Sequence, residues 1–259
     1  MKLKSTFAHT ALAALMLAGI TQAALADQLD DIKKAGTIRV AIAIGTPLFS
    51  YTDANMQPTG SDVDTATELA KDLGVKLEIV PITTAARIPT LQAQRADVVI
   101  SALSITEERA KAVTFADPHY CSGGVIVAKT DAIRSAKDLA GKVVAVQTGT
   151  TYLDNVKKVR DVKDVKNFPQ DNNARAALMT GRVDAWVVDK FVAKAANQTD
   201  PKSGLKIGDF LFIERIAPAV AKGNTGLAQA LSQALAAIQA DGSYAKISQR
   251  WFKEDIRCK

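Results

Sequence analysis

Short apolar segments of strand character alternate with segments of helical spacing, and this alternation limits most strongly how the chain can fold. In residues 37–44 the isoleucines and the valine fall on every second position, which is typical of a strand. Further strands are predicted at 75–82 and 97–103, and helices are predicted at 61–74 and 86–96. This β-α-β-α-β order predicts a doubly wound α/β structure.

The same alternation starts again in the second half of the chain. Strands are predicted at 142–149, 165–169 and 183–189, with helices at 150–159 and 172–182 between them. The stretches "PITTAARIPTLQAQRAD" and "PQDNNARAALMTGRVD" also echo each other, because each places an arginine six residues after a proline and ends on an aspartate. Two similar units within one sheet would also give this echo. We favour two doubly wound α/β lobes, because each half has its own series of strands and helices.

Residues 1–26 have the composition of a cleaved secretory signal peptide. Lys2 and Lys4 precede an apolar core at 11–20, and the small-x-small sequence "ALA" that ends at Ala26 resembles a signal-peptidase site. The apolar core is too short to span a bilayer, which argues against a membrane anchor. No cysteine follows the core directly, which argues against a lipid anchor. We therefore predict that the chain is exported and that its mature form begins after Ala26.

The composition of the mature chain argues against several classes of protein. Removal of Lys2 and Lys4 lowers the net charge from +6 to about +4, and no basic stripe interleaved with aromatic residues is present, so no nucleic-acid partner is predicted. His119, Cys121 and Cys258 are the only histidine and cysteines left, which excludes a metal site built on several such ligands. Neither a metal nor a cofactor is predicted. In an exported chain the two cysteines favour a Cys121–Cys258 disulfide over two buried free thiols.

Polar groups follow three of the predicted strands. Ser101 and Ser104 come at the end of one strand with Arg109 after them, the turn "QTGTT" at 147–151 follows another, and Asp189 ends a third. Ligands of open α/β sheets bind outside the carboxyl ends of the strands. An arginine fork fits a carboxylate, a glycine-rich turn before a helix favours an anion, and an aspartate accepts an ammonium. Together these groups predict a site for an α-amino acid.

Each of these residues also has an ordinary structural explanation. Arg109 can form a surface ion pair with Glu107 or Asp117, and Asp189 can cap the helix that follows it. The combination of all the groups at strand ends is what favours a binding site.

Several motifs give the chain a family resemblance. The stretches are "GSDVDTATELAKDLG", "DVVISALSITEERAKAVTFADPHY", "DLAGKVVAVQTGTT", "DNNARAALMTGRVDAWVVD" and "ISQRWF", which together cover nearly the whole mature chain. They resemble the periplasmic solute-binding proteins of polar amino-acid ABC transporters, family 3. The "SxSITxER" element followed by "FADPxY" is the most specific of these motifs.

The resemblance implies a fold like that of the type II periplasmic binding proteins, with the ligand held in a cleft between two lobes. Lobe 1 would comprise residues 27–120 and 217–259, and lobe 2 would comprise residues 121–216. Two hinge crossovers would join the lobes, near 121–125 and near 213–217.

The resemblance also implies a set of contacts to the main chain of the ligand. Arg109 matches the arginine that binds the α-carboxylate, and Ser104 matches the neighbouring hydroxyl. The lobe 2 turn that also binds the carboxylate would be formed by Thr148, Thr150 and Thr151. Ala102 matches the backbone carbonyl, and Asp189 the aspartate, that bind the ammonium.

The residues that would contact the ligand side chain depart from the pattern of basic amino-acid binders. Ala43 stands where those proteins carry an acid, and Thr46 where they often carry an aromatic residue. Thr84 and Arg87 instead resemble the residues of acidic amino-acid binders that contact a side-chain carboxylate, so glutamate or aspartate is suggested. A structural ion pair is the alternative for Arg87. Phe49 is expected either to wall the aliphatic part of the ligand or to pack in the core.

The resemblance predicts a monomeric periplasmic component of an ABC importer. It would bind a polar amino acid with closure of the cleft and deliver it to the membrane permease, without catalytic residues. One alternative is a periplasmic enzyme of the same fold, such as a dehydratase that acts on a small carboxylate. Another is a binder of an amino-acid conjugate such as an opine.

Overall fold

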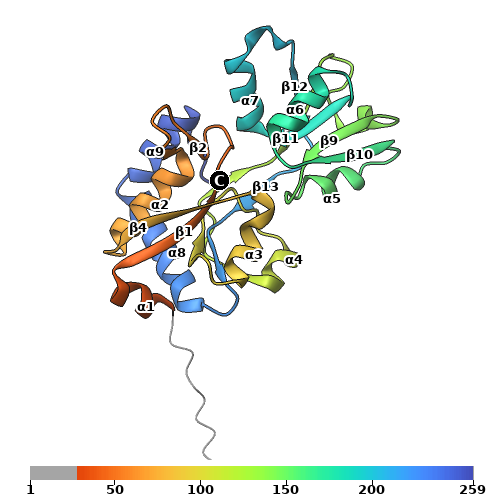
Figure 1. The fold of residues 1–259 in the computed structure, drawn as a ribbon. Helices are drawn as coiled ribbons and strands as arrows, with labels where there is room; N and C mark the ends of the chain where they lie inside the picture. The colour runs from red at the N-terminus through yellow and green to blue at the C-terminus, as the bar shows by residue number, and fades with distance from the viewer. Residues whose placement is uncertain (1–27, 259) are drawn as a thin grey trace, which may run out of the picture.

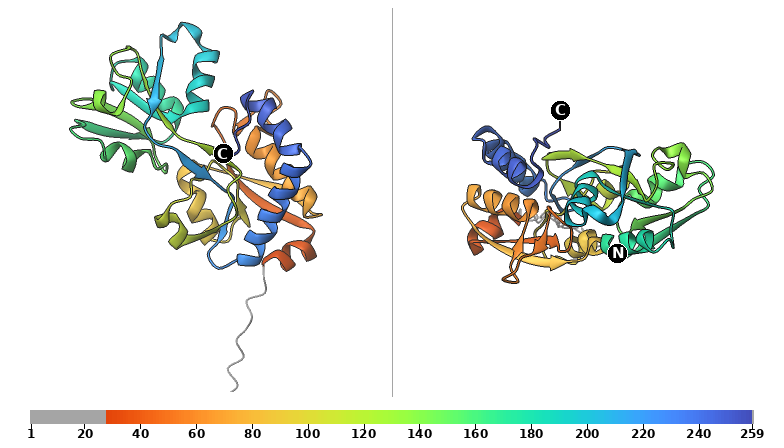
Figure 2. Two further views of the ribbon diagram at one scale, coloured as in Figure 1. Left: turned by 180° about the vertical axis from the view of Figure 1, so that it is seen from behind. Right: turned by 90° about the horizontal axis from the view of Figure 1, so that it is seen from above.

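The computed structural model describes residues 28–258, so the predicted signal peptide at 1–26 lies outside the described residues. The chain forms two α/β units, each built on a five-stranded sheet covered by helices (Figures 1 and 2). This architecture confirms the predicted fold class. Within residues 28–258 there is no helix of the length and apolarity that crossing a membrane would need.

The first sheet has the strand order β4-β1-β5-β14-β6. Its strands are β1 (Thr37–Ala43), β4 (Lys76–Ile82), β5 (Val98–Val99), β6 (Val113–Phe115) and β14 (Ala219–Ala221). β1 runs parallel to β4 and β5, whereas β14 runs antiparallel to β5 and β6. The last strand therefore returns to the first sheet after the chain has built the second.

Helices cover both faces of the first sheet because the side chains of β1 alternate between them. Val40 and Ile42 join the core formed with α2 (Ser61–Asp72) and α8 (Thr225–Ala240), whereas Ala41 joins the core formed with α3 (Arg87–Gln92). The other elements of this unit lie around these layers. They are α1 (Gln28–Ala35), β2 (Tyr51–Thr52), β3 (Pro58–Thr59), the 3-10 turn η1 (Thr84–Ala86), α4 (Glu107–Ala112) and α9 (Ser243–Phe252).

The second sheet has the order β10-β9-β11-β8-β12. Its strands are β8 (Gly124–Ala128), β9 (Val143–Gln147), β10 (Asp164–Phe168), β11 (Ala185–Asp189) and β12 (Lys206–Phe210). β9 pairs in parallel with β10 and β11, and β8 is antiparallel to β11 and β12.

The side chains of β11 alternate in the same way. Trp186 and Val188 pack with the apolar side of α6 (Asp171–Met179) and α7 (Lys190–Thr199), and Val187 packs on the opposite face with α5 (Tyr152–Lys157). The 3-10 turns η2 (Ala136–Leu139) and η3 (Pro201–Ser203) complete the unit.

Two aspartates explain the echo between the two halves of the sequence. Asp97 stands before β5, where its carboxylate accepts a hydrogen bond from the backbone N–H of Arg39 in β1 at 2.8 Å. Asp184 stands before β11, where its carboxylate accepts from the backbone N–H of Val143 in β9 at 2.7 Å. The repeated motif thus fixes the start of a central strand in each sheet.

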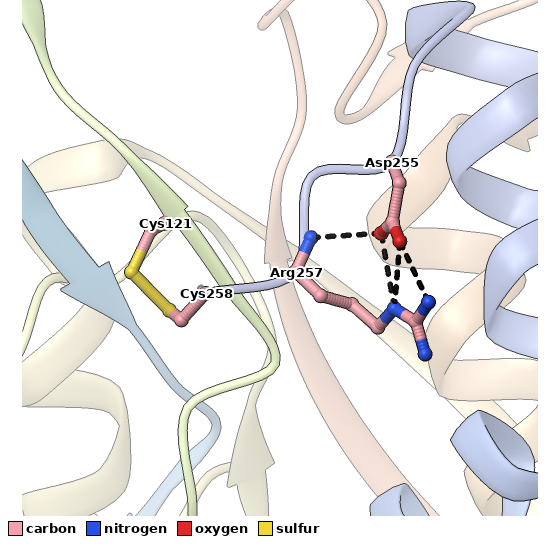
Figure 3. The surroundings of a disulfide bond; sticks show 4 residues. All are labelled: Cys121, Asp255, Arg257 and Cys258. Atoms are coloured by element: carbon pink, nitrogen blue, oxygen red, sulfur yellow. Dashed lines mark hydrogen bonds and ion pairs between the residues drawn. A yellow bond between two sulfur atoms is a disulfide. The ribbon is translucent and has the colours of Figure 1, made fainter.

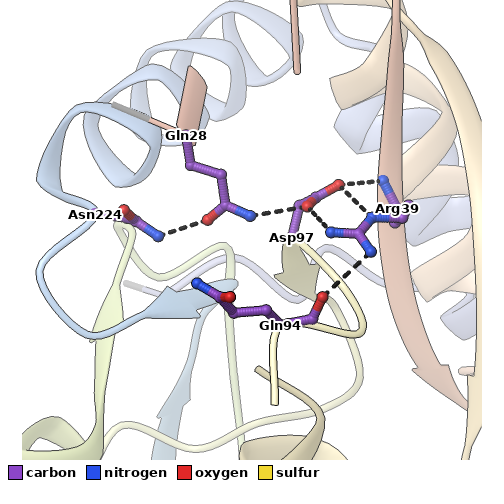
Figure 4. A network of polar contacts seen from close by, with 5 residues as sticks. All are labelled: Gln28, Arg39, Gln94, Asp97 and Asn224. Atoms are coloured by element: carbon purple, nitrogen blue, oxygen red, sulfur yellow. Dashed lines mark hydrogen bonds and ion pairs between the residues drawn. The ribbon is translucent and has the colours of Figure 1, made fainter. Parts of the chain in front are cut away.

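Asp97 also anchors helix α1 at the amino-terminal end of the central strands, opposite the end where the strands finish (Figure 4). It accepts from the Arg39 guanidinium at 2.6 Å and from the Gln28 side chain at 2.8 Å. Asn224 donates to Gln28, and the backbone carbonyl of Gln94 accepts from Arg39. This network joins residues that are distant in the sequence.

The two units are connected by an antiparallel pair, β7 (Tyr120–Ser122) and β13 (Glu214–Ile216). The predicted disulfide is confirmed, with Cys121 in β7 bonded to Cys258 at a Cα–Cα distance of 4.8 Å (Figure 3). The backbone N–H of Cys121 also donates to Ile256, so the C-terminal segment lies along a connecting strand. The exact lobe boundaries stay a prediction.

Candidate functional site

A cavity of about 40 Å³ lies between the two units, where the carboxyl ends of several parallel strands meet. The lining residues from the first unit are Thr46, Phe49, Asp62, Thr84, Arg87, Ser101, Ala102 and Ser104. Those from the second unit and the connections are Tyr120, Gly123, Gln147, Thr150, Tyr152, Asp171, Asp189, Val192, Glu214 and Ile216.

Most of the residues predicted from sequence line this cavity, namely Phe49, Thr84, Arg87, Ala102, Ser104, Thr150 and Asp189. Arg109 and Thr151 line a groove that shares Thr150 and Glu214 with the cavity. Thr148 is exposed and lines neither the cavity nor the groove. The structure therefore brings the predicted groups together except for Thr148.

Arg87 is buried and donates to backbone carbonyls in both units. Its Nε binds the carbonyl of Thr84 at 2.9 Å, and its Nη1 binds those of Ser101 and Ala102 at 2.8 and 2.9 Å. Its Nη2 binds the carbonyl of Gly149, in the other unit, at 2.8 Å. These bonds use four of the five N–H groups of the guanidinium.

Arg109 reaches the same carbonyl from α4. Thr106 caps this helix by accepting the backbone N–H of Arg109, and the guanidinium donates to the carbonyls of Ser104 and Gly149, both at 3.0 Å. The two guanidiniums therefore converge on Gly149. Burial, with the nearby charge of Arg109 as a further cause, lowers the pKa of Arg87 to about 9.

Ser104 and Asp189 are already hydrogen-bonded. The hydroxyl of Ser104 donates to Glu214 in β13. The carboxylate of Asp189 accepts from the hydroxyl of Ser122 and, at 2.7 Å, from the backbone N–H of Phe191. Asp189 is thus the cap of α7 and a wall of the cavity at once, so its structural explanation and its predicted role are compatible.

Two further carboxyl groups, Asp62 and Asp171, line the cavity and are almost fully buried. Within residues 28–258, Asp62 Oδ2 and Asp171 Oδ1 have no hydrogen-bond partner. Burial raises the pKa of Asp62 to about 8 against the opposing charge of Arg87. Burial likewise raises the pKa of Asp171 to about 7 and that of Asp189 to about 6.

The raised pKa of Asp62 predicts a pH-dependent stability. A carboxyl that binds its proton more tightly in the folded chain contributes stability at low pH, which is lost as the pH rises from about 4 toward 8. Asp62→Asn should therefore gain stability relative to the wild type over this range, by up to about 1.4 kcal/mol per pH unit. Urea unfolding at several pH values measures the difference. Asp72→Asn, an exposed change on the same helix, should show no such trend, and a flat difference for Asp62→Asn would contradict the prediction.

Phe49 packs in the core, and it also lines the cavity, so its contact with a ligand stays a prediction. It is 1% exposed, its ring lies 5.8 Å from that of Tyr120 and 5.1 Å from that of Phe252, and it also lines the cavity. It is a core residue whose edge forms part of the cavity wall.

The sequence contained a signal for only one of the two missed carboxyl groups. Asp171 comes just after β10, so the rule that sites form at strand ends points to it, but the predicted helix began one residue later. Asp62 lies in the first turn of α2, where an aspartate is ordinary as a helix-terminus residue.

The chain matches a known family model along most of its length. The model describes the bacterial extracellular solute-binding proteins, family 3, and matches residues 38–254. The L-cystine-binding protein TcyJ of Escherichia coli K12 is 31% identical, over 95% of this chain and 94% of the relative. The ABC transporter arginine-binding protein 1 of the same organism is 32% identical, over 85% of this chain and 92% of the relative.

Solved structures are similar as well. An ancestral arginine-binding protein bound to glutamine has a TM-score of 0.80 and 43% identity, covering 85% of this chain and 99% of its own. The ancestral amino acid-binding protein AncCDT-1, a precursor of cyclohexadienyl dehydratase, has a TM-score of 0.81 and 37% identity, covering 87% of this chain and 99% of its own.

Proposed function

Because the chain belongs to the bacterial extracellular solute-binding proteins of family 3, we propose that it captures a polar amino acid in the periplasm. It passes the amino acid, as a monomer, to the membrane permease of an ABC importer. The observation that carries this proposal is the charge arrangement of the cavity. Arg87 and Asp189 line it, and Arg109 lies at its mouth, so groups for a carboxylate and for an ammonium meet in one place.

Recognition of the ligand main chain follows from the donors and acceptors at the cavity. Arg109 uses two of its five N–H groups on carbonyls, which leaves donors for the α-carboxylate. The nearby hydroxyl of Thr150 donates to the carbonyl of Gln147 at 2.6 Å, so it would have to turn to reach the ligand. The ammonium is held by Asp189 and by the carbonyl of Ala102, which both line the cavity. Ser104 assists by turning its hydroxyl from Glu214 to the carboxylate.

Binding is coupled to closure of the two units. The lobes 27–120 with 217–259 and 121–216 rotate about the crossovers near 121–125 and 213–217, where β7 and β13 pair. The ligand contacts groups of both lobes, so it stabilises the closed arrangement. The permease then recognises the closed surface.

The side-chain class of the ligand is a finer question, for which the sequence suggests glutamate or aspartate through Thr84 and Arg87. Two observations favour a neutral or cationic side chain instead. Arg87 is occupied by four backbone carbonyls, and the carboxyl groups of Asp62 and Asp171 face the cavity beside it. A second ligand carboxylate would find most donors of Arg87 taken, whereas a neutral or cationic side chain can hydrogen-bond the carboxyl oxygens of Asp62 and Asp171, which burial keeps largely or partly protonated.

Arg87→Ala separates these alternatives. If Arg87 is an interlobe support, the variant should weaken binding of glutamate and of glutamine by the same factor, because the loss is in closure. Calorimetric titration of both amino acids measures the two factors. A loss confined to glutamate or aspartate would restore the acidic-ligand hypothesis.

The bound molecule itself tests the proposed function. Native mass spectrometry of the purified mature protein should show one amino acid per chain, released on unfolding and identified by its mass. Asp189→Asn should carry much less of it, because the neutral amide holds the ammonium weakly. Release of a molecule other than a free α-amino acid, such as an opine-like conjugate, would change the ligand class.

An enzyme of the same fold is a second candidate, favoured by the raised pKa values of Asp62 and Asp171. Such protonated carboxyl groups are suited to general acid catalysis, for instance in loss of water from a small hydroxylated carboxylate. His119 is not a candidate base, because it is buried away from the cavity and burial lowers its pKa to about 3. NMR of such carboxylates incubated with the protein distinguishes turnover, abolished in Asp171→Asn, from simple binding.

A further inference from the structure

At Gly149 the backbones of the two units approach each other closely. It lies in the turn between β9 and α5 with φ +83°, in the left-handed region that favours glycine. A Cβ atom at this position would lie 2.7 Å from Ala85 Cα and 2.9 Å from Ala85 N, across the gap between the units. Both of these are backbone atoms, so no side-chain rotation relieves the overlap. Only a residue without a Cβ permits this approach.

The carbonyl of the same residue is the shared acceptor of the two arginines. Arg87 binds it at 2.8 Å and Arg109 at 3.0 Å. Both arginines come from the first unit, whereas Gly149 belongs to the second. The side-chain amide of Gln147 donates to the hydroxyl of Thr84 at 3.2 Å, close to the same contact. These three hydrogen bonds between the units therefore lie around one turn, apart from the ion pairs that Lys190 and Lys194 of the second unit form with Glu254.

We propose that Gly149 is the closure contact of this protein, a positioning residue that acts through Arg87 and Arg109. Its missing Cβ lets the two units meet at Ala85, and its carbonyl binds both Arg87, the interlobe support, and Arg109, which faces the ligand carboxylate. Ligand capture and closure thereby share Arg109. This inference rests on the proposed function in one respect, namely that an amino acid occupies the cavity.

The chemical logic is that two guanidiniums repel each other unless acceptors lie between them. Closure brings one neutral carbonyl to both, and a ligand carboxylate adds the negative charge that the pair lacks. The ligand therefore favours the closed arrangement because it completes the coordination of Arg109, which Gly149 already holds beside Arg87. Loss of the Gly149 contact should raise the dissociation rate most, since the closed state is what retains the ligand.

Two variants test this contact from opposite sides. Gly149→Ala adds a Cβ to the second unit, and Ala85→Leu adds bulk at an exposed position of the first unit without changing Gly149. Gly141→Ala is the matched control, because Gly141 has φ +72° but no atom within 4 Å of the added Cβ. It carries the same backbone strain without the close approach.

The measurement is the radius of gyration by small-angle X-ray scattering, together with binding rates by surface plasmon resonance. The mature proteins are refolded free of ligand and measured alone and with L-arginine, L-glutamine or L-glutamate as probes. Gly149→Ala and Ala85→Leu should remain expanded with every probe. For any probe that the wild type binds, their affinity should fall about tenfold or more, mainly through faster dissociation. Gly141→Ala should match the wild type in compactness and affinity.

A Gly149→Ala protein as compact as the wild type, with unchanged affinity, would overturn the proposal. Melting curves of Gly149→Ala and Gly141→Ala confirm that both fold. If the wild type binds none of the probes, the proposed function fails for these ligands, and the closure contact is then decided with proteins measured as purified, before refolding removes the molecule that they carry. A larger radius of gyration for Gly149→Ala than for the wild type supports the contact, and equal radii refute it.

Discussion

Arg109→Ala is expected to weaken binding of any α-amino acid by about a hundredfold or more. Removing one partner of a hydrogen-bonded charge pair costs about 2–5 kcal/mol, because the ligand carboxylate is left desolvated without its counter-charge. The variant also loses the bond from Arg109 to Gly149, so closure is weakened together with recognition. Isothermal titration with the amino acid that the wild type binds best measures the loss.

Two further variants make the Arg109 result specific. Arg95→Ala removes an exposed arginine of the same unit and should leave the affinity unchanged. Arg109→Lys keeps the charge but not the planar fork, so an intermediate affinity is expected. Near-normal binding by Arg109→Ala would remove the carboxylate-binding role of this residue.

Loss of the disulfide is expected to cost about 2–5 kcal/mol of unfolding free energy. The bond joins residues 137 positions apart in the sequence, and closing so long a loop removes much entropy from the unfolded chain. It also holds the C-terminal segment, including the buried Ile256, against β7. Urea unfolding of the Cys121→Ser, Cys258→Ser double variant should show a lower midpoint, with a steeper slope because the unfolded chain without the cross-link is less compact.

Reduction of the wild type provides the control for this prediction. The reduced protein and the double variant should unfold at the same urea concentration, because both lack the same cross-link. Unchanged stability in both would contradict the prediction. A stable double variant together with an unstable reduced wild type would instead indicate that the free cysteines of the reduced protein had oxidised incorrectly.

The fold could be predicted largely from local patterns in the sequence. The alternation in residues 37–44 corresponds to β1, and the helical spacing of 61–74 corresponds to α2. The repeated aspartates at 97 and 184 marked equivalent strand starts. The separate series of strands and helices in each half was what supported two units rather than one. Strands and helices of this kind depend on neighbouring residues and on burial of one face, so the spacing of apolar residues along the sequence predicts them.

Other features depend on contacts between distant segments, which periodicity does not report. The strand predicted at 97–103 ends at Val99, because the chain turns at Ala102 with φ 45° to place its carbonyl at Arg87. The return of β14 to the first sheet follows from pairing across more than a hundred residues.

The sequence analysis named both arginines at the candidate site, but of the aspartates it named Asp189 and missed Asp62 and Asp171. Arg87 and Arg109 stood out because each follows or precedes a strand end rich in hydroxyls. The burial that raises the pKa of Asp62 and Asp171 depends on tertiary packing, so no local pattern reported it, although the position of Asp171 after a strand end was a signal that the prediction missed. Their presence also changes the favoured side-chain class of the ligand.

A thermal-shift screen of the mature protein tests the central claim most directly. The protein is unfolded and refolded to remove any carried ligand, then melted with each amino acid and with a few conjugates. Ligand at a hundredfold above its dissociation constant adds about 2.7 kcal/mol, which is a rise of roughly 5–10 °C for a chain of this size.

We predict a selective rise with one or a few polar amino acids that bear a neutral or cationic side chain. A rise with glutamate or aspartate would keep the transport function and return Arg87 to the ligand site. No rise with any amino acid or conjugate would contradict the proposal that this cavity binds an amino acid.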